Sequence, residues 1–339
     1  MNNYQGRAVL VTGGAGFIGS HLVEELVRRG AEVTVLDDLS SGHLRNLAAV
    51  KDRVDLRTFN LQRDDIESLL AGRNFEMIFH LAGHADVPYS VQNPILDFEK
   101  NAFATLRLIE TTRHLQPQAK VLLASSAAVY GDSLGESFRE EDPTWPIAPY
   151  GVSKLTAERY FDAYARSYGL RTASLRLFPI YGPRLKAHVV YDLIRKVCEN
   201  PHELFIHGDG SQVRDFTHVK DAVEAFLIVA DRAPLRGEVY NVAAGEPVSI
   251  QALAEMICKT MGVAPRFVYS GNVAPGVSQR WFADVSRLNS LGYRPRVSFT
   301  DGLDETVAWF REVMRVEPSE TSQTSSDLVP VFSTKIQEA

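Results

Sequence analysis

Tyr150 and Lys154, four positions apart, are the pair of side chains in this sequence best suited to proton transfer. Residues i and i+4 lie on one face of a helix, so the lysine ammonium can lie near the phenol. A free phenol has a pKa of about 10, and a nearby positive charge lowers it, which prepares the oxygen to accept a proton. Ser126 follows an apolar run and offers a hydroxyl to a substrate oxygen. We therefore predict Ser126, Tyr150 and Lys154 as catalytic residues, with Ser126 and Tyr150 also contacting the substrate.

A glycine-rich turn lies near the N-terminus. Gly13, Gly16 and Gly19 have the spacing G-x-x-G-x-x-G directly after the apolar run 8–11. The first glycine permits a tight turn, the second lets the backbone approach a pyrophosphate, and the third lets a helix pack closely on a strand. The start of that helix adds amide donors and the positive end of its dipole. Followed by a serine and then by Tyr-x-x-x-Lys, this turn predicts a site that binds a dinucleotide and moves hydride.

Two acidic residues indicate which dinucleotide is bound. Asp37 ends the second predicted strand, where a carboxylate can accept hydrogen bonds from both ribose hydroxyls. It would repel a 2′-phosphate, and Asp38 follows with no adjacent arginine. We therefore predict NAD rather than NADP, with Lys154 also holding the nicotinamide ribose.

The elements that must position these residues alternate along the chain. Short apolar runs predict strands over 7–12, 32–36, 54–58, 77–81, 121–125 and 172–177. Helical patterns occupy the intervals, over 17–29, 66–70, 98–114 and 153–168. Such alternation predicts an α/β fold, a doubly wound parallel sheet with helices on both faces.

After residue 179 the sequence has more proline and glycine and shorter elements. A strand is predicted over 239–242 and helices over 250–261 and 302–316. We therefore expect an NAD-binding Rossmann domain over 1–178 and a smaller, mainly substrate-binding lobe over 179–316, with some segments returning to the first domain. Residues 317–339 are polar and low in complexity, which predicts a disordered tail.

The composition is typical of a cytoplasmic enzyme. The 339-residue chain is 45% hydrophobic and has a net charge of −6, which gives no electrostatic case for binding nucleic acid or acidic membranes. Its first apolar run is too short for a signal peptide or a membrane span. The two cysteines, Cys198 and Cys258, have no ligand spacing and indicate reduced core thiols. No metal, nucleic-acid or membrane partner is predicted.

Seven segments carry a resemblance to a known family. The chain resembles the extended short-chain dehydrogenase/reductases, and among them the NAD-dependent nucleotide-sugar epimerase/dehydratase group that includes the UDP-glucose 4-epimerases. The likeness covers roughly residues 5 to 315. The matching segments are 12–19, 36–42, 80–83, 125–131, 149–154, 181–184 and 208–216.

The resemblance implies a ligand set. NAD is expected to contact Gly13, Gly16, Phe17, Ile18, Gly19, Asp37, Asp38, Asn60, Leu61, Leu81, Ala82, Ala85, Asn101, Tyr150 and Lys154. The substrate implied is a nucleotide sugar, a UDP-sugar first of all, held by Ser126, Tyr150, Arg184, Phe205 and Arg214. Arg214 matches the arginine that grips the diphosphate, for which a fork of donors is suited.

One tripeptide separates the reactions of this group. Similar dehydratases carry Thr-Asp-Glu where this chain has Ser126-Ala127-Ala128, so the general acid and base of water elimination are missing. The tripeptide resembles that of the 4-epimerases, which oxidise C4 of the sugar and return hydride to its other face. The alternatives are a nucleotide-sugar ketoreductase or dehydrogenase, another reaction of the group on an atypical substrate, and a non-catalytic redox sensor.

Two positions depart from the group's pattern. Pro179 replaces an asparagine that contacts the sugar phosphates, and proline offers no donor there. Ala274 replaces an arginine that grips a phosphate. These changes predict a thinner diphosphate cradle and allow for an atypical substrate.

The resemblance also implies a homodimer. Its members pair through two helices per subunit, here expected to be 98–114 and 153–168. The apolar contacts are then predicted from Leu106, Ile109, Tyr160 and Tyr164. The alternative is that these four side chains only pack on the sheet.

Overall fold

The computed structural model describes residues 4–132, 137–271 and 280–316. At its centre is a seven-stranded, all-parallel sheet with the order β11-β6-β5-β4-β1-β2-β3. Its strands are β1 (Ala8–Thr12), β2 (Glu32–Asp37), β3 (Val54–Thr58), β4 (Met77–His80), β5 (Lys120–Ser126), β6 (Arg171–Leu177) and β11 (Arg236–Val242). The predicted α/β fold is confirmed. The strand order reverses on either side of β1, which creates a crevice between β1 and β4 at the carboxyl edge.

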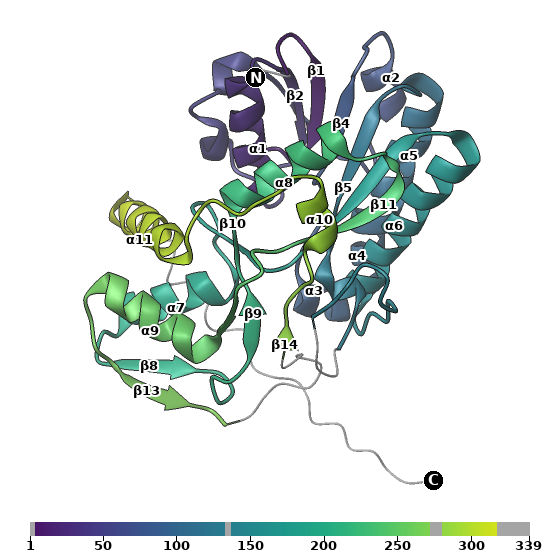
Figure 1. Ribbon diagram of the computed structural model, residues 1–339. Coiled ribbons are helices and arrows are strands. Elements are labelled where there is room, and N and C mark those ends of the chain that lie inside the picture. The colour runs from purple at the N-terminus through teal and green to yellow at the C-terminus, as the bar shows by residue number, and fades with distance from the viewer. Residues whose placement is uncertain (1–3, 133–136, 272–279, 317–339) are drawn as a thin grey trace.

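Helices cover both faces of this sheet (Figure 1). One face carries α1 (Phe17–Arg28) and α8 (Val219–Arg232), and the other carries α2 (Ile66–Leu70), α5 (Ala104–Leu115) and α6 (Pro149–Tyr168). Neighbouring residues of β1 enter opposite cores, Val9 with α1 and Leu10 with α5. This is why the strand reads as an unbroken apolar run rather than an alternating one.

The helix predicted over 98–114 is divided. α3 (Val87–Gln92) and α4 (Pro94–Phe98) come first, and the π-helical turn η3 (Glu99–Phe103) joins α4 to α5. A π turn adds one residue to the helical turn, and nothing in the apolar periodicity marks it. α6 begins at Pro149, four residues earlier than predicted. A proline fits the first turn because its missing N–H has no helical partner there.

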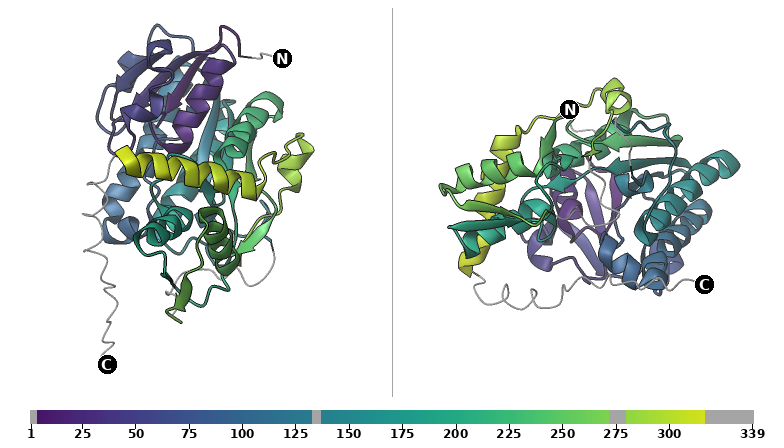
Figure 2. Two further views of the ribbon diagram at one scale, coloured as in Figure 1. Left: turned by 90° about the vertical axis from the view of Figure 1, so that its left-hand side faces the viewer. Right: turned by 90° about the horizontal axis from the view of Figure 1, so that it is seen from below.

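The remaining elements form a second lobe with its own apolar core. Its strands are β7 (Ile180–Tyr181), β8 (Glu203–Ile206), β9 (Val213–Asp215), β10 (Thr217–His218), β12 (Pro247–Ser249), β13 (Arg266–Tyr269) and β14 (Arg280–Trp281). Its helices are α7 (His188–Glu199), α9 (Ile250–Met261) and α11 (Phe299–Val316). α11 lies across the junction between this lobe and the sheet domain (Figure 2, left). α8, β11 and α10 (Ser286–Ser290) return to the large sheet, so the two lobes alternate along the sequence.

Short 3-10 turns complete the chain: η1 (Leu44–Leu47), η2 (Lys51–Arg53) and η4 (Ala127–Val129). The tail predicted over 317–339 and the departure at Ala274 lie outside the described residues.

Candidate active site

The glycine turn between β1 and α1 is too closely packed for side chains. Gly13 has a φ of +71°, and a β-carbon there would lie 2.6 Å from the Ala82 nitrogen at the end of β4. A β-carbon on Gly19 would overlap the carbonyl oxygen of Gly13. Phe17 and Ile18 open α1, so the amides of its first turn face the crevice edge of the sheet. A glycine cradle at a helix start fits the pyrophosphate of NAD.

Asp37, at the end of β2, stabilises the glycine turn through hydrogen bonds to the backbone. Its carboxylate accepts hydrogen bonds from the backbone N–H of Ala15 (2.9 Å) and of Leu39 (2.9 Å). Burial raises the pKa of Asp37, and these two N–H groups oppose that shift. The side chain of Asp38 lies beside Asn60, 3.5 Å from carboxylate oxygen to amide nitrogen. Four of the predicted NAD contacts thus lie at the ends of the neighbouring strands β2 and β3: Asp37, Asp38, Asn60 and Leu61.

We expect Asp37→Asn to weaken NAD binding by about 1–3 kcal/mol, the cost of a charged hydrogen bond left unmade. The asparagine oxygen can still accept from one of the two backbone amides, so the turn keeps most of its support. Titration calorimetry with NAD and NADP measures the effect. Equal affinity of the unaltered protein for NAD and NADP would contradict the role given to Asp37.

The end of β4 carries the next group of predicted NAD contacts. Leu81 and Ala82 follow β4 directly, and the Asn101 side chain holds the chain before Ala85 by bonding the backbone N–H and C=O of His84, both at 3.1 Å. Asn101 comes from η3, so the π turn places this amide against the loop.

Sequence reasoning missed a buried histidine beneath these contacts. The His80 ring bridges two hydroxyls, with Nδ1 2.7 Å from Thr12 Oγ1 and Nε2 2.8 Å from Thr105 Oγ1. Burial lowers the pKa of His80 to about 3, so the ring is neutral. It ties the end of β1 to α5 below the crevice. The sequence pattern predicted that His80 lies in a strand, but it did not indicate that Thr12 and Thr105 are its hydrogen-bond partners.

Ser126 and Tyr150 meet where β5 ends and α6 begins. Ser126 Oγ accepts the Ala128 N–H at 3.1 Å and also hydrogen-bonds the Tyr150 phenol. Burial raises the pKa of Tyr150 to about 12, whereas the Ser126 hydrogen bond acts to lower it. The expectation of a lowered phenol pKa is therefore wrong for this structure, because the sequence does not reveal how completely the phenol is buried.

Lys154 lies one turn further along α6 and is also buried. Its Nζ donates to the Ala124 carbonyl at 3.1 Å, and a β-carbon on Gly83 would lie 3.1 Å from the same nitrogen. Burial lowers the pKa of Lys154 to about 8, and the carboxylates of Asp97 and Glu158 oppose that shift. The lysine is thus held between β5 and the loop after β4.

The predicted substrate residues lie on separate elements. Arg214 of β9 is partly buried, and its guanidinium lies 5.8 Å from the centre of the Trp281 ring and donates to the Val213 carbonyl. Among the residues that the structure describes, no carboxylate lies within ion-pairing distance of Arg214, and burial lowers its pKa. Phe205 is exposed on β8. The carbonyl of Pro179 accepts the Thr217 N–H at 2.9 Å.

Arg184 has other partners. It pairs with Glu24 of α1 at 2.6 Å and donates to Ser20 Oγ at 3.1 Å. These contacts fasten the loop after β7 to the helix that follows the glycine turn. Its predicted contact with the substrate stays a prediction.

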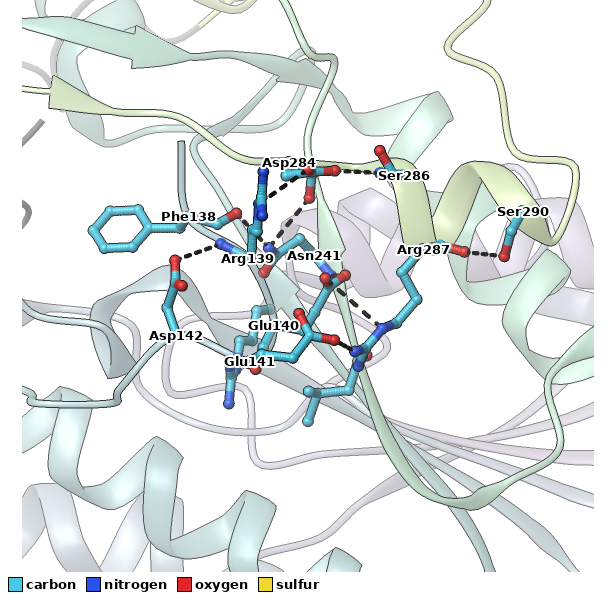
Figure 3. A network of polar contacts seen from close by, with 12 residues as sticks. Phe138, Arg139, Glu140, Glu141, Asp142, Asn241, Asp284, Ser286, Arg287 and Ser290 are labelled. Carbon is cyan, nitrogen blue, oxygen red and sulfur yellow. Dashed lines mark hydrogen bonds and ion pairs between the residues drawn. The ribbon is translucent and has the colours of Figure 1, made fainter. Parts of the chain in front are cut away.

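A polar network joins residues 138–142 to Asn241 of β11 and to residues 284–290 (Figure 3). Glu140 accepts the Asn241 backbone N–H at 2.8 Å, and the Asn241 amide donates to the Phe138 carbonyl at 3.0 Å. The Tyr130 hydroxyl donates to Asn241 Oδ1 at 2.7 Å, and Arg287 of α10 bonds Glu141. The network thus holds Tyr130, Phe138 and Glu140 against Asn241 of β11.

Over residues 4–132, 137–271 and 280–316, no cluster of three or more histidine, cysteine or acidic side chains could hold a metal ion. None of the helices in those ranges is both long and apolar enough to cross a membrane.

Comparison with known proteins identifies the family. A model of the NAD dependent epimerase/dehydratase family matches residues 9–243. The chain belongs to this family. It is 31% identical to a putative UDP-glucose 4-epimerase of Methanocaldococcus jannaschii, over 89% of this chain and 98% of the relative. It is 33% identical to a dTDP-glucose 4,6-dehydratase of Streptomyces niveus, over 90% and 93%.

A solved structure shares both the fold and the cofactor. The UDP-glucose 4-epimerase of Thermus thermophilus in complex with NAD has a TM-score of 0.81 and 34% identity, over 90% of this chain and 99% of that one. This epimerase/dehydratase family member is therefore an NAD-dependent enzyme of nucleotide sugars. Its relatives include epimerases, dehydratases and decarboxylases, so family membership alone does not select the reaction.

Proposed function

We propose that this protein is an NAD-dependent nucleotide-sugar 4-epimerase that acts on a UDP-sugar. The observation that carries the proposal is the segment Ser126-Ala127-Ala128 at the end of β5, beside Tyr150. Ala127 is buried, and neither alanine can protonate a leaving hydroxyl or remove a carbon-bound proton. A 4-keto sugar formed here can therefore only be reduced again.

Each catalytic side chain has one task in this reaction. When bound, NAD would supply the hydride acceptor, and the positive charge of its nicotinamide ring would favour the phenolate of Tyr150. The Tyr150 oxygen accepts the proton of the C4 hydroxyl and returns it when C4 is reduced. Ser126 holds the same sugar oxygen, and Lys154 holds the nicotinamide ribose and keeps positive charge near the phenol.

Inversion at C4 requires that the sugar turns while the nucleotide stays anchored. Arg214 supports this part of the proposal because it is a partly buried cation without a carboxylate partner in the described ranges, as expected of a group that pairs with a phosphate. Its neighbour Trp281 belongs to the same short sheet as β9. We place the diphosphate at Arg214 and the nucleotide towards the exposed ring of Phe205.

The test follows UDP-glucose and UDP-N-acetylglucosamine by NMR with the purified protein and no added NADH. Interconversion of C4 epimers without a net change in cofactor is the expected result. A 4-keto-6-deoxy product, a pentose product or stoichiometric NADH would overturn the proposal. Stoichiometric NADH would favour a ketoreductase or dehydrogenase instead.

Substitution of Arg214 by Met should raise KM far more than it lowers kcat.

A homodimer and a cytoplasmic location are part of the proposal. Of the four side chains predicted as dimer contacts, Ile109 and Tyr164 are buried in the core between the sheet and its helices, and Leu106 and Tyr160 are partly buried and pack against that core. Seven of the exposed apolar side chains come from α3, α4, η3 and α6, which pack on one another; they are Val87, Val91, Ile95, Leu96, Phe98, Phe103 and Val152. We propose this apolar patch as the dimer interface. The free cysteines suit a reducing compartment.

We expect Ile95→Asp to convert the dimer to monomers. Ile95 is 73% exposed, so its substitution leaves the core intact. A carboxylate buried between subunits costs several kcal/mol, which weakens association at least roughly 100-fold. Light scattering at micromolar concentration measures the change, with Leu44→Asp as the control because Leu44 is also exposed, at 57%, but lies on η1. A monomeric unaltered protein would refute the interface.

A further inference from the structure

A fully buried carboxylate, Asp97, lies behind the catalytic centre. It belongs to α4, and both its side-chain oxygens accept hydrogen bonds from neutral groups. The Asn101 amide donates at 2.9 Å and the Ser153 hydroxyl at 2.7 Å. In the ranges that the structure describes, no cation lies within ion-pairing distance of Asp97. A buried carboxylate without a compensating charge is costly, so a cation nearby must offset it.

The geometry around Asp97 points to Lys154 as that cation. Ser153, which Asp97 holds, immediately precedes Lys154 in α6. Asn101, its other partner, lies with Lys154 around Gly83, where an added β-carbon would be 2.6 Å from the Asn101 oxygen and 3.1 Å from the Lys154 nitrogen. Asp97 is the carboxylate with the largest electrostatic effect on the pKa of Lys154.

A second buried carboxylate provides a contrast. Glu158 also lies near Lys154, but it forms a two-pronged ion pair with Arg176, with nitrogen–oxygen distances of 2.9 and 3.0 Å. Its charge is therefore already compensated. The other titratable group that faces Lys154 is the neutral His80 of β4. Asp97 itself also faces His84 and the Tyr150 phenol, whose pKa it acts to raise.

We propose that Asp97 is a positioning residue of the catalytic centre, whose buried carboxylate fixes Ser153 and Asn101 and supplies the counter-charge that keeps Lys154 an ammonium ion. The proposal rests on the role of Lys154 in the proposed function, where the ammonium holds the nicotinamide ribose. A charged donor bonds a hydroxyl more strongly than a neutral amine does. NAD affinity should therefore fall as pH rises through the pKa of Lys154, which burial lowers to about 8.

The experiment is NAD titration calorimetry on Asp97→Asn from about pH 6 to 10. The asparagine can keep both hydrogen bonds but removes the negative charge, so the pKa of Lys154 falls further. A fall of one unit lowers its protonated fraction at pH 8 from about one half to about one tenth, which is roughly a fivefold loss of affinity. Near pH 6 the affinity of the variant should equal that of the unaltered protein.

Two further variants separate charge from structure. Ser153→Ala removes one hydrogen bond but keeps the carboxylate, so the pH midpoint should stay in place even if affinity falls. Asp162→Asn makes the same chemical change on α6, beside Arg166, and should leave the midpoint unmoved. The proposal would be overturned if Asp97→Asn lowered NAD affinity by the same factor at every pH. It would also be overturned if Ser153→Ala moved the midpoint of the pH dependence.

This readout is independent of the sugar reaction. If the unaltered protein binds NAD with the expected pH dependence but epimerises no sugar, the proposed function fails and the role of Asp97 stands. If it epimerises sugars and the midpoint of Asp97→Asn is unchanged, only the role of Asp97 fails. If Asp97→Asn does not fold, Asp97→Glu should keep the midpoint, and a shifted midpoint there would overturn the proposal.

Discussion

Tyr150→Phe is expected to lower turnover by roughly 10²–10⁴, the usual contribution of a positioned acid–base group. The phenol is buried and hydrogen-bonded to Ser126, and its ring also fills space at the start of α6. Phenylalanine keeps the ring and removes only the oxygen. NAD should therefore remain bound, because the predicted cradle for its phosphates lies in the glycine turn between β1 and α1. Steady-state rates with the sugar identified by NMR measure the loss, and calorimetry measures NAD.

Tyr164→Phe is the matched control. Tyr164 lies on the same helix and donates its hydroxyl to Glu110 at 2.9 Å, away from the crevice. Its loss should change turnover by less than about tenfold, below the range expected of an acid–base group. Near-normal turnover in Tyr150→Phe would remove the proposed mechanism. A loss of bound NAD as large as the loss of turnover would instead assign the tyrosine to cofactor binding.

The sequence was a good guide to the sheet because the sheet depends on local patterns. Strands such as β1 and β5 are continuous apolar runs that end in glycine or serine, and that pattern follows from burial on both faces. The G-x-x-G-x-x-G spacing likewise depends on the backbone alone. Chain order then placed the predicted NAD residues at the ends of β1, β2, β3 and β4, which the parallel pairing brings to one edge.

The contacts made by side chains from distant segments could not be predicted in the same way. Arg184 matches a family segment, but its pairing with Glu24 depends on how the second lobe packs on α1. Ile109 and Phe98 are both apolar residues of one predicted helix, yet Ile109 enters the core and Phe98 is exposed. The π turn between them changes which face of the helix each residue occupies.

Glu158→Gln is expected to destabilise the protein by about 3–5 kcal/mol, because it leaves the buried charge of Arg176 without its partner. Arg176 and Glu158 are each only 3% exposed, and Arg176 also lies 4.6 Å from the centre of the Tyr130 ring. Glu158 further accepts the Ser125 hydroxyl, next to the catalytic serine. Glutamine keeps the size and an acceptor but not the charge.

Urea unfolding measures this change in the free energy of unfolding. The comparison requires that the slope of that free energy against urea concentration is the same for the variant and the unaltered protein. Asp162→Asn removes the partner of Arg166 on the same helix, where the arginine side chain is 76% exposed, and should cost less than about 1 kcal/mol. An equal cost for the two variants would mean that burial adds nothing to the Glu158–Arg176 pair. If the prediction holds, turnover should fall along with stability, because this pair joins β6 to α6 and Glu158 holds the end of β5. The same ion pair then supports the fold and keeps Ser126 in place beside Tyr150.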